Sequence, residues 1–82
     1  MTRLPGDVSG IELARLLEKY GYQITRQTGS HIRLTTQMNG EHHVTLPVHK
    51  ELRVGTLNAV LTDVADHLGM ERNEVVAALY ER

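Results

Sequence analysis

The chain has five histidines and no cysteine, so imidazole is the side chain best able to carry out chemistry. His31 follows a Gln-Thr-Gly-Ser stretch typical of a turn and begins a segment in which polar and apolar residues alternate. Imidazole titrates near neutral pH and can act as a base or an acid. In RNA cleavage without a metal, a base takes the proton of the attacking ribose 2′-hydroxyl and an acid protonates the leaving 5′-oxygen, each contributing about 10²–10⁴-fold. His31 is therefore a candidate catalytic residue, although a solvated strand histidine has the same spacing.

Three basic residues could hold phosphate near His31. Arg33 lies two residues further along the alternating segment, so it should share the face of His31 and could stabilise the negative charge that develops on phosphorus. Lys50 and Arg53 precede a predicted helix, whose N-terminal amide groups favour a phosphate. Ordinary solvated side chains remain the alternative for all three.

Gly29, Ser30 and His49 could support the same site. A turn at Gly29 often needs a positive φ, which glycine adopts without strain. Ser30 could orient the imidazole or contact phosphate, or it could simply cap the turn. His49 could be a second proton-transfer group or an RNA contact, or a loop histidine that bonds the backbone.

We expect no metal and no cofactor. Without cysteine, a metal would need histidine and carboxylate ligands. The adjacent pair His42-His43 is the obvious candidate, but neighbouring strand residues point to opposite faces and cannot chelate one ion without a bulge.

The composition fits one folded domain over residues 1–82, with 40% hydrophobic and 23% charged residues. No apolar run is long enough for a bilayer span or an export signal, so we expect a cytoplasmic protein with no membrane partner. The net charge is −1, but residues 22–53 carry four Lys/Arg against two Glu. This weakly basic middle segment permits contact with phosphates.

Hydrophobic spacing predicts helices at both ends of the chain. Ser9 and Glu12 have the spacing of a capping box before a leucine-rich stripe, which predicts a helix over residues 10–20 that Gly21 closes. A second helix should begin near residues 54–56, where Thr56 could cap it, and should end at Gly69. A short third helix should follow over residues 72–80.

Between these helices, an alternation of period two predicts three antiparallel strands. The first, which includes Ile24, should be half buried. Asn39-Gly40 should join the second strand to the third. The residues expected to face the core are Tyr22, Ile24, Ile32, Leu34, Val44, Leu46 and Val48.

The register of the second and third strands follows from keeping apolar residues on one face. A two-residue turn at Asn39-Gly40 would mix the faces. A loop of three or five residues sets Leu34 opposite Leu46 and Ile32 opposite Val48, and we expect this register. It would place His31 nearly opposite His49.

Four motifs, in this order, resemble the HicA toxin family (YcfA-like). They are Gly21-Tyr22, Arg26 to His31, Val44 to His49, and Leu52 to Leu57, within a stretch from about Ile11 to Leu68. The resemblance implies an α+β, double-stranded-RNA-binding-like fold, in which helices cover one face of a three-stranded antiparallel sheet. It also implies an mRNA interferase activity, a HicB-like antitoxin as partner, and a catalytic histidine at the position of His31. The loop between His49 and Leu52 departs from the family because it lacks the Gly-Asn often found there.

The sequence thus leads to the hypothesis of a toxin that cleaves mRNA, with His31 as general base or acid. Ser30, Arg33, His49, Lys50 and Arg53 are the candidate RNA contacts. Two alternatives remain open, namely a non-catalytic RNA-binding module and a domain that only binds another protein.

Overall fold

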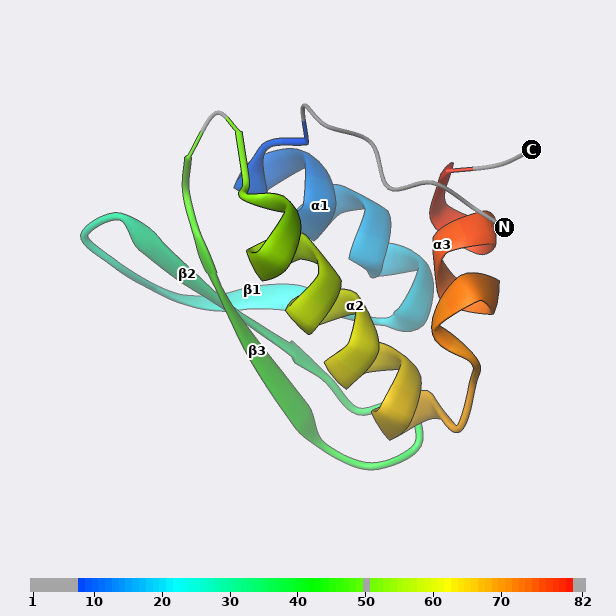
Figure 1. Ribbon diagram of the computed structural model, residues 1–82. Coiled ribbons are helices and arrows are strands. Elements are labelled where there is room, and N and C mark those ends of the chain that lie inside the picture. The colour runs from blue at the N-terminus through cyan, green and yellow to red at the C-terminus, as the bar shows by residue number, and fades with distance from the viewer. Residues whose placement is uncertain (1–7, 50, 81–82) are drawn as a thin grey trace.

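The computed structural model describes residues 8–49 and 51–80, arranged as Figure 1 shows. The elements are helix α1 (Gly10–Leu17), the 3-10 turn η1 (Glu18–Tyr20), strands β1 (Gln23–Thr28), β2 (His31–Thr36) and β3 (His42–Pro47), and helices α2 (Val54–Leu68) and α3 (Arg72–Tyr80). In this described part of the chain, the strands form a three-stranded antiparallel sheet of order β1-β2-β3. Helices α1 and α2 cover one face of the sheet, and α3 packs against α2. The predicted α+β fold, with the element order of double-stranded-RNA-binding-like domains, is confirmed.

Helix α1 begins where the sequence predicts. Ser9 has extended backbone angles, and its hydroxyl accepts a hydrogen bond of 3.0 Å from the N–H of Glu12. Such a cap contributes about 1 kcal/mol to helix stability. Leu13 and Leu17 are fully buried, and Gly21 ends η1 with a φ of 81°. The last predicted turn of the helix is therefore the tighter 3-10 turn.

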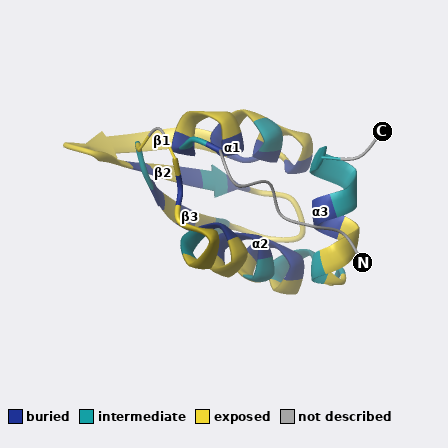
Figure 2. Ribbon diagram, turned by 45° about the horizontal axis from the view of Figure 1, so that its top comes forward, coloured by how far each residue is buried: buried dark blue, intermediate teal, exposed yellow. Residues whose placement is uncertain are grey.

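Strand β1 departs from its prediction because all six of its residues are exposed. Tyr22 is buried just before the strand, but Ile24 is 51% exposed. β1 is an edge strand, and the hairpin that it forms with β2 projects beyond the helices (Figures 1 and 2). Helix α1 therefore leaves the inner side of β1 largely uncovered, so the predicted half-burial does not occur.

Strand β2 separates the core from the solvent. Ile32 and Leu34 are buried, whereas His31 and Arg33 on the alternate face are exposed, as predicted. Thr36 continues the buried face. Its hydroxyl donates to the carbonyl of Tyr20 at 2.7 Å and accepts the N–H of Met38 at 3.0 Å.

The register of β2 and β3 differs from the prediction by two residues. Leu34 lies opposite Val44, and Ile32 lies opposite Leu46. The predicted faces are right, because apolar residues still pair with apolar residues, but the predicted pairs are wrong. In consequence His31 lies opposite Pro47 rather than near His49.

The five-residue loop between β2 and β3 explains this register. Asn39 and Gly40 both have positive φ, at 59° and 96°. His67 of α2 donates from Nε2 to the carbonyls of Met38 and Gly40, at 2.9 and 3.0 Å, while Asn39 donates to the carbonyl of His67 at 2.7 Å. Contacts with α2, which is distant in the sequence, thus stabilise this loop conformation. Turn preferences depend on neighbouring residues only and cannot predict such contacts.

Helices α2 and α3 complete the core with the predicted apolar residues. Leu57 and Leu61 of α2 are buried, and so are Val75 and Val76 of α3. Gly69 ends α2 with a φ of 68°. The expected cap by Thr56 is wrong, because the helix begins at Val54 and its N-cap residue, Arg53, makes no side-chain capping bond.

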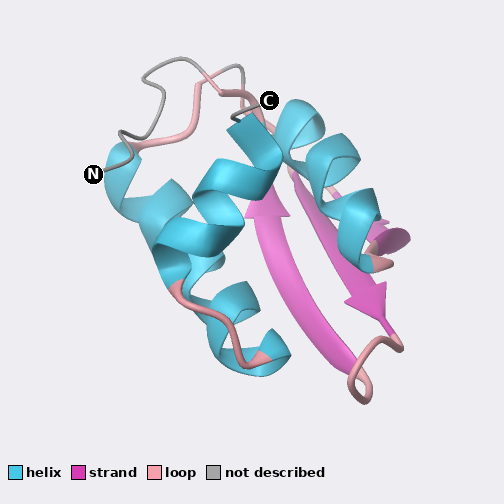
Figure 3. Cartoon of the chain, turned by 90° about the vertical axis from the view of Figure 1, so that its right-hand side faces the viewer, coloured by secondary structure: helices cyan, strands magenta, loops and turns pink. Residues whose placement is uncertain are grey.

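Viewed from the α3 end, α3 lies in front, and the strands are seen farther back between the helices (Figure 3). None of the helices in residues 8–49 and 51–80 combines the length and apolar character needed to cross a bilayer.

Replacing Thr36 with valine should preserve the shape of this buried position while removing its hydroxyl. The Tyr20 carbonyl and the Met38 N–H would each lose a partner, so we expect the free energy of unfolding to fall by about 1–3 kcal/mol. Urea denaturation measures this change. Thr45→Val, an exposed position in β3, is the matched control and should change the free energy by less than about 0.5 kcal/mol. Equal losses in both variants would contradict this account.

Candidate functional site

The sheet face opposite the helices, here called the open face, carries polar side chains from all three strands. Its residues are Arg26 and Thr28 of β1, His31, Arg33 and Thr35 of β2, and His43, Thr45 and Pro47 of β3. An open hollow of about 330 Å³, here called the central hollow, lies on it. The hollow is lined by Arg26, Thr28, His31, Ile32, Arg33, His43 and Thr45. This lining contains no acidic residue.

His31 is the first residue of β2 and lies opposite Thr28 on one side and Pro47 on the other. Its side chain is exposed. Nδ1 lies 3.5 Å from the Ser30 hydroxyl, at the limit of a hydrogen bond, and Nε2 makes no hydrogen bond to another described residue. The imidazole is thus open to solvent and to a ligand in the hollow.

The turn before His31 depends on Gly29. Its φ is +56°, as the sequence predicts, and a Cβ there would meet no atom within 4 Å. The requirement for glycine is therefore one of backbone angle and not of space. Because only two residues separate Thr28 from His31, this turn fixes how β2 begins.

Backbone contacts at the far end of β3 hold the same turn. The N–H of Val48 donates to the carbonyl of Ser30 at 2.6 Å, and the N–H of Gly10 donates to the carbonyl of His49 at 3.0 Å. A Cβ on Gly10 would collide with the carbonyl oxygen of Pro47. Close packing of α1 on the end of β3 thus supports the position of His31, a role for Gly10 that the sequence analysis missed.

Arg33 projects from the open face two residues beyond His31, as predicted. Arg26, which the sequence analysis did not single out, lies directly opposite it on β1. Both side chains are exposed and line the central hollow.

His43 also lines the hollow. Its Nε2 bonds a carboxylate oxygen of Glu41 at 3.1 Å, and its Nδ1 bonds the Thr35 hydroxyl at 2.7 Å. Because a carboxylate only accepts, Nε2 carries a proton, and in the neutral ring Nδ1 accepts from Thr35. Hydrogen bonds from Gln37 and then from His43 hold the pKa of Glu41 below its usual value. The alternation of β3 correctly predicts His43 on the polar face. The incorrect register, however, predicts that His49 is the second histidine near His31.

Two other predicted contacts, His49 and Arg53, do not line the hollow. His49 is exposed beyond the end of β3, and Arg53 is exposed at the start of α2. Lys50 lies outside the described residues. The structure therefore brings Arg33 to His31 and does not bring His49 or Arg53 there.

His42 has a different environment from His43, on the opposite face of β3, as the alternation predicts. Its Nδ1 bonds the Tyr22 hydroxyl at 2.7 Å, its Nε2 bonds Asp63 at 3.2 Å, and its ring stacks on His67 with centroids 4.3 Å apart. Burial, and then the charge of Asp63, raises the pKa of Tyr22 to about 12, so the phenol keeps its proton and donates it. His42 thus ties β3 to α2. Residues 8–49 and 51–80 contain no group of three or more potential metal ligands.

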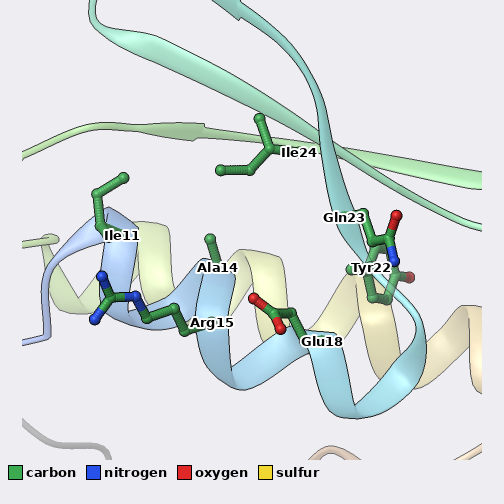
Figure 4. Close-up of a pocket in the computed structure, with 7 residues that line it drawn as sticks. All are labelled: Ile11, Ala14, Arg15, Glu18, Tyr22, Gln23 and Ile24. Carbon is green, nitrogen blue, oxygen red and sulfur yellow. The ribbon is translucent and has the colours of Figure 1, made fainter.

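A second hollow, of about 380 Å³, lies between α1 and β1 (Figure 4). Ile11, Ala14 and Ile24 supply apolar surface there, and Arg15 and Glu18 lie along α1 beside them. It exists because α1 does not cover Ile24. It lies on the helix side of the sheet, away from the open face.

These observations define a small α+β domain with the double-stranded-RNA-binding-like element order and a basic, histidine-containing open face. The family model described as the HicA toxin of bacterial toxin-antitoxin systems matches residues 10–65. The chain belongs to the HicA toxin family, and the family implies an antitoxin as partner. No curated protein and no solved structure matches the chain.

Gly29→Ala should destabilise the domain although nothing obstructs the added methyl group. An L-residue held at positive φ costs about 1–2 kcal/mol, and thermal unfolding should show a loss of that size. Gly55→Ala is the matched control, because Gly55 is also free of neighbours but adopts the φ of a helix. It should raise stability by roughly 0.4–1 kcal/mol. A stabilising Gly29→Ala would show that positive φ does not explain this glycine.

Proposed function

We propose that this toxin is an endoribonuclease that cleaves mRNA and so inhibits translation. The observation that carries the proposal is the exposed imidazole of His31 in a hollow lined by two arginines and no acidic residue. Cleavage of a ribose-phosphate chain requires stabilisation of negative charge and transfer of a proton at the same site. The arginines of this hollow supply positive charge, and His31 can transfer a proton.

The proposed reaction needs no metal ion. The ribose 2′-oxygen attacks the adjacent phosphorus while its proton passes to a base. The bond from phosphorus to the 5′-oxygen breaks, and that oxygen receives a proton from an acid. The products are a 2′,3′-cyclic phosphate and a 5′-hydroxyl. His31 acts as the base or as the acid, and the Arg33 guanidinium stabilises the negative charge on the phosphorane.

The other predicted contacts take smaller parts in this proposal. Ser30 is close enough to His31 to bias the orientation of the ring. His49 and Arg53 would contact RNA outside the central hollow, and Lys50 is proposed as an RNA contact from the sequence alone. We also propose that the antitoxin inhibits the toxin by covering the open face and excluding RNA from His31.

His31→Ala should abolish growth inhibition on induction in bacteria and slow RNA cleavage in vitro by about 10²–10⁴-fold. Gln27→Ala is the matched control, because Gln27 is exposed in the same hairpin but pairs with Ile32 on the other face. It should leave both readouts near those of the unmodified chain. Thermal unfolding of both variants checks that the hairpin is intact.

Three outcomes would overturn parts of the proposal. Equal toxicity and equal RNA decay with His31→Ala would remove His31 from the mechanism. RNA binding without cleavage by the unmodified chain would favour a non-catalytic RNA-binding module. A chain that neither binds nor cleaves RNA would favour a domain that only binds another protein.

The chemistry of the product ends tests the reaction type separately. Cleavage in excess EDTA should proceed at an unchanged rate and leave 2′,3′-cyclic phosphate and 5′-hydroxyl ends. A substrate with a single 2′-deoxyribose at the cleaved position should resist cleavage, because it lacks the attacking hydroxyl. Products with 5′-phosphate ends would exclude attack by the 2′-hydroxyl.

A further inference from the structure

Strand β1 contains one extra residue between Ile24 and Arg26. Before it, Gln23 pairs with Thr35, and Ile24 with Leu34; after it, Arg26 pairs with Arg33. The pairing numbers advance by one across Thr25, which is the signature of a β-bulge. The turn that sets Thr28 opposite His31 also sets Arg26 opposite Arg33, and the bulge lets Ile24 face the helices in the same strand.

Thr25 stabilises this irregularity with its own side chain. Its hydroxyl bonds the Thr35 hydroxyl at 2.8 Å and donates to the carbonyl of Arg33 at 3.4 Å. Both partners belong to β2. The extra residue is therefore tied to the neighbouring strand, and beyond it Arg26 lies on the same face as His31.

Arg26 and Arg33 are direct cross-strand neighbours. Like charges that face each other across a sheet destabilise it. Among the described residues, neither Arg26 nor Arg33 has a salt-bridge partner. Hydrogen bonds from Gln37 and His43 lower the pKa of the Glu41 carboxyl, and Arg33 is near enough for its charge to lower that pKa further. One carboxylate does not balance two guanidinium groups, and an anion in the central hollow would supply the remaining counter-charge.

The groups around the two arginines suit a phosphate. Each guanidinium offers several donors in a planar fork that matches phosphate oxygens, and the hydroxyls of Thr28 and Thr45 add neutral hydrogen-bonding groups to the lining. Along β2, His31 and Arg33 are two positions apart, which corresponds to about 7 Å. That distance is comparable with the separation of adjacent phosphates in an extended single strand.

We propose that Arg26 and Arg33 form a phosphate-binding pair, in which Arg33 contacts the RNA phosphate that reacts at His31 and Arg26 holds the adjacent phosphate. The proposal rests on the proposed function for the identity of the ligand, and on the pairing of β1 with β2 for the position of Arg26. Arg26 is thereby a substrate-positioning residue that β1 supplies to a site centred on β2.

Binding is best measured in the His31→Ala background, where RNA is not consumed. A single-stranded RNA oligonucleotide is titrated at several KCl concentrations. Adding Arg26→Gln should weaken binding about tenfold or more at low salt, because hydrogen bonds to charged groups are lost. The slope of log K against log salt should fall by about 0.7, the value for one phosphate contact on a single strand.

Two further variants test charge and geometry separately. Arg15→Gln removes the same charge from the exposed side of α1 and should change affinity by less than about twofold. Arg26→Lys keeps the charge but loses the planar fork, so it should recover most of the salt slope and only part of the affinity. Equal effects of Arg26→Gln and Arg15→Gln would overturn the proposal.

A titration with inorganic phosphate separates this proposal from the nuclease proposal. Arginine side-chain N–H signals are followed by NMR in the unmodified chain. Shifts confined to Arg26 and Arg33, with no RNA cleavage, would support the pair and overturn the nuclease function. RNA cleavage with unchanged RNA binding by Arg26→Gln would support the nuclease and overturn the pair. If neither phosphate nor RNA perturbs these signals, the pair is overturned.

Discussion

Burial of Ile32 and Leu34 against the helices is the constraint on which the open face depends. These two side chains anchor the middle strand, and successive residues of a strand must point to opposite sides. His31 and Arg33 are therefore directed outward by the residues that stabilise the core. A one-residue slip of β2 would bury a guanidinium and expose two apolar side chains, which is strongly unfavourable. The orientation of the candidate site is thus determined by the hydrophobic effect.

The two faces of the sheet use histidine in different ways. On the helix side, His42 and His67 bond fixed partners and connect the strands to α2. On the open face, the His31 ring has only a distant contact with Ser30. The same side chain serves as a cross-link where its nitrogens are satisfied, whereas at His31 one nitrogen is available for the proposed proton transfer.

Much of this architecture is predictable from local sequence, and the departures have identifiable physical causes. The cap at Ser9, the glycine turns and the alternation around Ile32 depend on neighbouring residues. The helices and the two faces of the sheet are therefore predictable from the local sequence. The register of β3 depends on His67, which is far away in the chain. Ile24 is exposed because α1 does not extend over that part of the sheet. The facing of Ile24 and Arg26 to opposite sides of β1 depends on one extra residue between them, which no short-range pattern indicates. For these reasons the sequence placed His31 and Arg33 correctly on the polar face but paired His31 with the wrong histidine and overlooked Arg26.

The irregularity at Thr25 also bears on self-association. β1 is an edge strand, and a regular edge presents unpaired N–H and C=O groups to which another chain can add. A bulge twists such an edge and interrupts its repeat, and a charged residue beside it disfavours a second strand of the same kind. The bulge at Thr25, with Arg26 beside it, therefore disfavours growth of the projecting hairpin into an intermolecular sheet, and resistance to aggregation through β1 is its consequence.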